Sequence, residues 1–118
     1  PQDDDMYIAD VYWLVLSQLR AGQADEAQKT LQQHYRPDMY VGHHTAYEKA
    51  MRVAAGFASM EDMLAELDAE EDGLQFAMTA YGLCVLLETH GETEKVDALR
   101  EKLLARDGFW FCFSYLNN

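Results

Sequence analysis

Four histidines are the residues of this sequence best suited to bind a metal ion. His43 and His44, together with His34 and Asp38, form the one candidate cluster. Adjacent histidines point to different sides of any regular element, and this spacing fits no zinc-site pattern. The sequence also lacks the common nucleophile, phosphate-binding, dinucleotide-binding, zinc-protease and kinase motifs. We therefore expect no metal, no cofactor and no catalytic activity.

Two cysteines, Cys84 and Cys112, are too few for a disulfide framework and do not form a CxxC pair. A catalytic cysteine needs a base close by, and His90 is the nearest candidate along the chain. Because His90 follows Cys84 by six residues, the two would point to different faces of a helix. We expect both cysteines to be small core residues of a protein in the reducing cytoplasm.

A run of carboxylates is the other group with chemical potential: Glu61, Asp62, Glu66, Asp68, Glu70, Glu71 and Asp72. Paired carboxylates can act as general acid and base, but only where burial in a pocket shifts their pKa values. The stretch after Asp68 lacks the loop and the closing glutamate of a calcium site. Two interpretations stay open: a solvated helix face, or a docking surface for a basic peptide or protein.

The composition suits one compact domain over residues 1–118, with a mass of 13.5 kDa and 49% hydrophobic residues. Asp and Glu outnumber Lys and Arg by 21 to 9, which gives a net charge of −12. This charge disfavours nucleic acid and anionic lipid as partners, since both need a basic surface. No apolar run is long enough for a membrane span, and the acidic start PQDDDMY does not resemble a signal peptide.

The helical spacing of apolar residues, among many helix-favouring residues, predicts an all-α fold. The predicted helices cover residues 6–21, 25–35, 44–55, 59–69, 74–90 and 93–106. In the first helix Leu14 belongs to an apolar stripe and Trp13 widens it, so burial on two sides is expected. The fifth is apolar nearly all round and should be central, and the sixth should turn Leu103 and Leu104 inward.

Three glycines, Gly22, Gly56 and Gly91, recur 34 and 35 residues apart, each between two predicted helices. A tight turn there needs a residue that tolerates positive φ, as glycine does. The helices therefore form three pairs, at about residues 6–36, 44–69 and 74–106. One pair cannot bury both of its faces, so neighbouring pairs must pack together.

This period and these turns resemble the tetratricopeptide repeat (TPR) family. The residues that carry the resemblance are Leu14, Gly22, Gln23, Ala24, Asp25, Glu26 and Ala27 in the first pair and Leu83, Leu87, Gly91 and Val96 in the third. The resemblance implies a right-handed array of αα-hairpins, in which the first helix of each pair lines a concave binding surface. The lining that it implies here is Gln18, Tyr47, Arg52, Tyr81 and Glu88. Evenly spaced glycine turns also fit an unrelated helical bundle, and that alternative stays open.

The sequence ends in a dense aromatic block, GFWFCFSYLNN. As a helix it would align Phe109, Phe113 and Leu116, and it would cap the last pair or begin a further one. If the block is not covered, it is an apolar patch large enough to bind a partner or a second copy of the chain. We therefore add Trp110 and Phe113 to the candidate binding residues.

Together these features predict a non-catalytic, TPR-like module that binds a protein or peptide and acts as a scaffold or adaptor. Apolar and aromatic contacts would hold the partner, and the acidic residues would attract a basic one. Two alternatives stay open. One is a small acidic secretion-type chaperone that covers a client helix, and the other is a helical domain of a larger enzyme or regulator.

Overall fold

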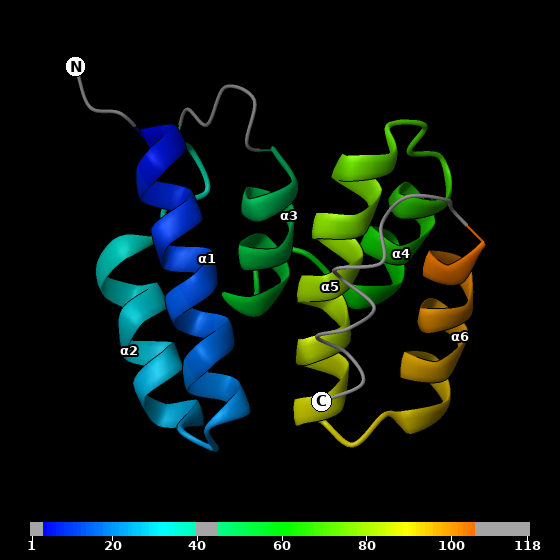
Figure 1. Ribbon diagram of the computed structural model, residues 1–118. Coiled ribbons are helices and arrows are strands. Elements are labelled where there is room, and N and C mark those ends of the chain that lie inside the picture. Colours follow the sequence, from blue (N-terminus) through cyan, green and yellow to red (C-terminus); the bar gives the residue numbers. More distant parts are fainter. Residues whose placement is uncertain (1–3, 40–44, 106–118) are drawn as a thin grey trace.

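Residues 4–39 and 45–105 are described by the computed structural model, and this part of the chain is all-helical (Figure 1). The helices are α1 Asp4–Arg20, α2 Ala24–His34, α3 Thr45–Ala54, α4 Met60–Asp68, α5 Gly73–Thr89 and α6 Thr93–Leu104. Their ends lie within two residues of the predicted bounds, so the all-α prediction is confirmed. None of these helices is both long and apolar enough to cross a membrane.

Each pair of helices turns at its glycine with the same backbone geometry. The φ angles are 77° at Gly22, 88° at Gly56 and 73° at Gly91. At every turn the glycine N–H donates to the carbonyl oxygen three residues earlier, and the next N–H donates to the carbonyl oxygen five residues earlier. These bonds form the Schellman motif, which satisfies carbonyls at a helix end. The predicted need for a residue with positive φ at all three turns is confirmed.

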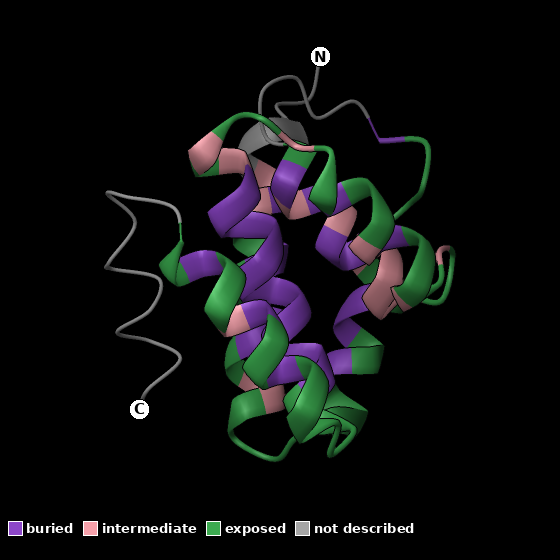
Figure 2. Cartoon of the chain, turned by 90° about the vertical axis from the view of Figure 1, so that its right-hand side faces the viewer, coloured by how far each residue is buried: buried purple, intermediate pink, exposed green. Residues whose placement is uncertain are grey.

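Helix α5 is the centre of the core, as its all-round apolar composition predicted. Every residue from Phe76 to Leu87 is buried. The helix packs against α1, α3, α4 and α6, and the buried residues gather on the inward faces of these helices (Figure 2). Because burial of apolar surface is the main favourable term in folding, these contacts with α5 help to hold α1, α3, α4 and α6 in place.

A glycine inside α5 lets three helices approach one another closely. A Cβ atom added at Gly82 would lie 2.7 Å from the Cβ of Ala50 in α3 and 3.0 Å from Cε2 of Tyr12 in α1. Both distances are too short for ordinary carbon contacts, so the crossing depends on the missing side chain. The sequence analysis did not single out this glycine.

Helix α1 joins the first two helices to the rest of the described fold. Helix α1 packs against both α3 and α5, so the first pair contacts the third pair directly. Among the described helices, α2 packs closely against α1 alone. In Figure 1, α1 and α2 lie on one side, α4 and α6 on the other, with α3 and α5 between them. The flank of α2 that faces away from α1 is therefore not covered by a closely packed helix.

Three expectations about individual side chains are wrong. Trp13 is 38% exposed, Leu14 is 48% exposed and Leu104 is 44% exposed. On α1 the buried stripe passes through Tyr12, Val15 and Leu16, and the helical rotation places Trp13 and Leu14 on the two sides of that stripe away from the core. Helix α6 packs closely only on α5 within the described chain, so Leu104 has no second helix to cover it.

Candidate binding pocket at the glycine-turn end

A cavity of about 330 Å³ lies among all three helix pairs, and residues next to each of the three glycine turns line it. Its apolar wall includes Val15 and Leu19 of α1, Leu31 of α2, Val53 of α3, Met60 of α4 and Leu86 of α5. Helix α6 adds Lys95 at its first turns. We call this cavity the turn-end pocket. Because every helix contributes to it, no single pair could form it.

Small side chains leave this space empty. Ala24 and Ala27 of α2, Ala54 of α3 and Ala58 of the α3–α4 turn all line the pocket. Helix α2 packs closely against α1 alone in the described chain, and these short side chains lie beside Gln28, Leu31 and Met60 in the gap between α2 and the second pair. Protein interiors are normally filled to crystal-like density, and four methyl groups cannot fill a gap of this size.

Polar and charged side chains contribute the rest of the lining. They are Gln28, Glu61, Thr89, His90, Glu92 and Lys95. The amide nitrogen of Gln28 donates to the carbonyl oxygen of Ala54 at 3.4 Å and so links α2 to the end of α3. Nζ of Lys95 lies 3.9 Å from Oε1 of Glu92, an exposed pair of small energetic weight. The lining thus combines an apolar wall with two carboxylates, an ammonium group and an imidazole.

A second depression, of about 260 Å³, adjoins the first. It is lined by Gln28, Leu31, Gln32, Tyr35, Ala55 and Phe57, and we call it the Phe57 pocket. Gln28 and Leu31 line both pockets, so these two side chains form the partition between them. Phe57 is 60% exposed, and its ring centroid lies 6.1 Å from that of Tyr35.

The sequence analysis missed Phe57, although a signal for it exists. The residue follows the turn glycine directly, and the same position in the other two turns holds Gln23 and Glu92. A large apolar residue at this position usually packs back onto its own helix. Here it leans toward α2 instead and stays largely exposed, which makes it the outstanding apolar group on this end of the described chain.

The buried carboxylate of Glu48 is hydrogen-bonded to Tyr35, which lines the Phe57 pocket. Glu48 of α3 accepts a 2.6 Å hydrogen bond from the hydroxyl of Tyr35 and a 3.0 Å hydrogen bond from Nε of Arg52. A second Arg52 nitrogen donates to the other carboxylate oxygen. Burial, the hydrogen bond to Glu48 and its charge raise the pKa of Tyr35. The hydrogen bond to Glu48 raises the pKa of Arg52. Tyr35 therefore stays neutral, and the network fixes the end of α2 against α3.

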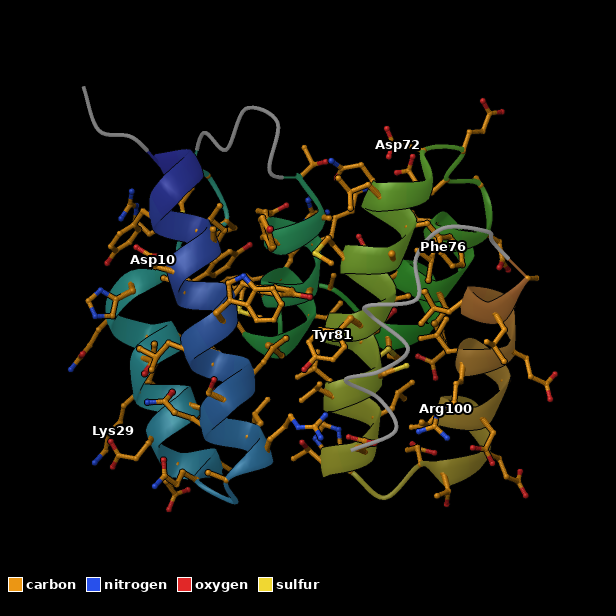
Figure 3. The ribbon with its side chains drawn as sticks, in the orientation of Figure 1. Asp10, Lys29, Asp72, Phe76, Tyr81 and Arg100 are labelled. Carbon is orange, nitrogen blue, oxygen red and sulfur yellow. The ribbon has the colours of Figure 1, made fainter. Side chains whose placement is uncertain are left out.

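The predicted site residues Tyr47 of α3 and Tyr81 of α5 both contact aromatic side chains of α1. The ring of Tyr47 stands edge-on to Tyr12 at 4.7 Å, and the ring of Tyr81 lies 5.8 Å from Trp13. Tyr81 is buried and lies between α1 and α5 (Figure 3). These aromatic rings belong to the packing between first helices of the pairs.

The other predicted site residues are dispersed. The side-chain oxygen of Gln18 accepts a 3.0 Å hydrogen bond from Thr30 and so joins α1 to α2. Glu88 lies 4.0 Å from Arg20 across the gap between α5 and α1, and Arg52 belongs to the Glu48 network. The turn-end pocket is lined by none of the five predicted residues that the structure describes. Trp110 and Phe113 lie outside the described residues.

Part of the acidic run has partners within the protein. Nζ of Lys49 lies 4.0 Å from Glu66 and 3.8 Å from Glu70, and Nζ of Lys102 lies 2.7 Å from Asp68. The carboxylate of Asp72 accepts a 3.0 Å hydrogen bond from the N–H of Gln75 and caps α5. Of the remaining carboxylates, Glu61 lines the turn-end pocket. The run therefore does not act as one uniform surface.

The candidate metal ligands are only partly visible. His34 Nδ1 and the hydroxyl of Tyr7 form a hydrogen bond, and His43 and His44 lie outside the described residues. Within residues 4–39 and 45–105, no three His, Cys, Asp or Glu side chains are grouped so that they could hold a metal ion.

Cys84 lies in the core, as expected, with no exposed surface. Burial raises the pKa of its thiol to about 12, so the thiolate is scarce at neutral pH.

The feature of the described chain best suited to bind another molecule is the turn-end pocket, with the Phe57 pocket beside it. Neither a protein-family model, nor a curated protein, nor a solved structure matches this chain.

Proposed function

We propose that this chain is a non-catalytic, TPR-like binding module whose turn-end pocket receives apolar side chains of a protein or peptide partner. The observation that carries the proposal is a cavity of about 330 Å³ with an apolar wall and a partly polar lining, to which all three helix pairs contribute. Natural ligand sites span about 300–1,000 Å³, and a cavity of about 150 Å³ already holds benzene. The pocket therefore has room for one or two large apolar side chains.

The TPR-like arrangement draws support from the repeated turns. The three glycine turns share both their positive φ and their pair of hydrogen bonds. In a linear stack, however, the second pair would separate the first from the third, whereas here α1 contacts α5. We therefore propose a short repeat array that closes on itself, with its binding site at the turn end in place of a concave wall lined by Gln18, Tyr47, Arg52, Tyr81 and Glu88.

A module of this kind would act as an adaptor or scaffold. It would present one pocket to one partner while the rest of its surface stays acidic. The buried free thiol of Cys84 supports a reducing compartment, and we propose the cytoplasm.

Filling the pocket tests the proposal. Ala54→Leu replaces a methyl group in the pocket wall with an isobutyl group. Ala69→Leu makes the same change at the exposed far end of α4. Benzene added to the ¹³C-methyl-labelled protein should shift the NMR signals of Leu19, Leu31 and Leu86 in the parent chain and in Ala69→Leu. The shifts should be much smaller in Ala54→Leu. Benzene shifts that are absent, or unchanged by Ala54→Leu, would contradict a binding pocket at this place.

A further inference from the structure

We infer that the partner docks with a cationic amphipathic helix, which places two apolar side chains in the turn-end pocket and the Phe57 pocket and basic side chains against the surrounding carboxylates. This inference rests on the proposed function, because it names the kind of partner that the same site takes.

The two pockets determine how the apolar side chains of the partner are spaced. They share Gln28 and Leu31, so one thin partition separates them along α2. On a helix, residues three or four positions apart project side by side on one face. A single partner helix can therefore fill both pockets with two apolar residues one turn apart. Phe57, exposed at the outer pocket, offers it an aromatic surface to pack on.

The charge around the pockets determines the charge of the polar side chains that the partner needs. Each second helix of a pair begins at this end, and acidic residues surround these starts: Asp25, Glu26, Glu61, Asp62, Glu92 and Glu94. Two lysines form ion pairs with these carboxylates: Nζ of Lys29 lies 3.5 Å from Glu26, and Nζ of Lys95 lies 3.9 Å from Glu92. The acids of the first turns also complement the helix dipoles, but their charge still reaches the solvent. This end of the molecule thus carries an excess of negative charge, and two of its carboxylates, those of Glu61 and Glu92, line the pocket.

The opposite end of the molecule also carries carboxylates with basic partners. There Lys49 lies beside Glu66 and Glu70, and Lys102 lies beside Asp68. The sequence analysis placed a docking surface for a basic partner on the whole acidic run. We place it at the start of that run, because Glu61 lines the turn-end pocket and Asp62 follows.

Three synthetic helical peptides of the same length test the inference. The first carries two leucines one turn apart with flanking lysines, the second has glutamates in place of the lysines, and the third has alanines in place of the leucines. Binding of each fluorescein-labelled peptide to the full chain is followed by fluorescence anisotropy. The lysine–leucine peptide should bind at least about tenfold more tightly than either of the others, and added salt should weaken it.

Two protein variants locate the binding. Glu61→Lys should weaken the lysine–leucine peptide about fivefold, as expected for the charges of exposed residues, while Glu71→Lys, the same change away from the pockets, should have little effect. Ala54→Leu should weaken the same peptide, and Ala69→Leu should not. Far-ultraviolet circular dichroism confirms that each variant is folded.

The outcomes distinguish a failure of the inferred partner from a failure of the proposed function. If the glutamate–leucine peptide binds as well as the lysine–leucine peptide, the cationic partner is wrong and the apolar site stands. If the lysine–leucine peptide binds but neither Glu61→Lys nor Ala54→Leu weakens it, docking at these pockets is wrong. If no peptide binds while benzene enters the pocket, the helical partner is wrong. If benzene also fails to enter, the proposed function falls as well.

Discussion

The hydroxyl of Tyr12 in α1 donates a buried 2.7 Å hydrogen bond to the carbonyl oxygen of Met78 in α5. Tyr12 has no exposed surface, and the bond joins residues 66 positions apart. It ties the first helix pair to the third, which a linear stack of pairs would keep apart. This contact therefore belongs to the closure that creates the turn-end pocket.

Removing the hydroxyl should weaken this closure without emptying the core. Tyr12→Phe keeps the ring but loses the hydrogen bond, and we expect the free energy of unfolding to fall by about 1 kcal/mol. Tyr12→Leu, which also loses the edge-on contact with Tyr47, should cost more. Urea denaturation followed by circular dichroism measures both. Equal stability of Tyr12→Phe and the parent chain would show that the bond contributes nothing to the fold.

Gly82 provides the matching test of close approach. In an open helix Gly→Ala gains about 1 kcal/mol of stability, because alanine favours the helix. Here the new methyl would lie 2.7 Å from the Cβ of Ala50, and overpacking of this kind costs about 1–3 kcal/mol. We expect Gly82→Ala to be destabilising overall.

A double-mutant cycle isolates the steric cause in that prediction. Ala50→Gly alone should destabilise α3, yet Gly82→Ala should cost less in the Ala50→Gly background than in the parent chain. Denaturation midpoints of the four chains give the coupling energy. A coupling near zero would mean that Ala50 does not limit the approach of α5 to α3.

Local patterns explain how much of the fold the sequence predicts. The glycines at 22, 56 and 91 end the first helices through positive φ, and this requirement depends on a few neighbouring residues only. The central position of α5 follows from its own composition, since a helix that is apolar all round has no face to give to water. Such features can be predicted without knowledge of how the pairs pack.

The candidate site could not be predicted in the same way. The pocket is lined by residues from every helix. It exists because α1 packs against α5, while α2 packs closely against α1 alone in the described chain. The choice of Gln18 and Tyr81 as lining residues assumed a linear stack, and the structure instead uses both in helix packing. The lining alanines carry no pattern that separates them from alanines placed for helix propensity.

The Tyr35–Glu48–Arg52 network predicts a loss of stability at high pH. Burial, together with the hydrogen bond and charge of Glu48, raises the pKa of Tyr35 in the folded state above its unfolded value of about 10. A group with a raised folded pKa holds its proton more tightly when folded, so its contribution is complete below pH about 10 and is lost above it. Ionised Tyr35 would also face the carboxylate of Glu48 at hydrogen-bond distance.

Comparison with Tyr35→Phe separates this effect from other groups that titrate at high pH. Cys84 acts in the same direction, because its folded pKa of about 12 exceeds that of a free thiol. Both chains keep Cys84, so the difference between their free energies of unfolding reports Tyr35 alone. Urea denaturation should show the parent chain more stable at neutral pH and this advantage shrinking as the pH rises above about 10. An advantage that stays constant through this range would mean that the folded state does not hold the Tyr35 proton more tightly than the unfolded chain.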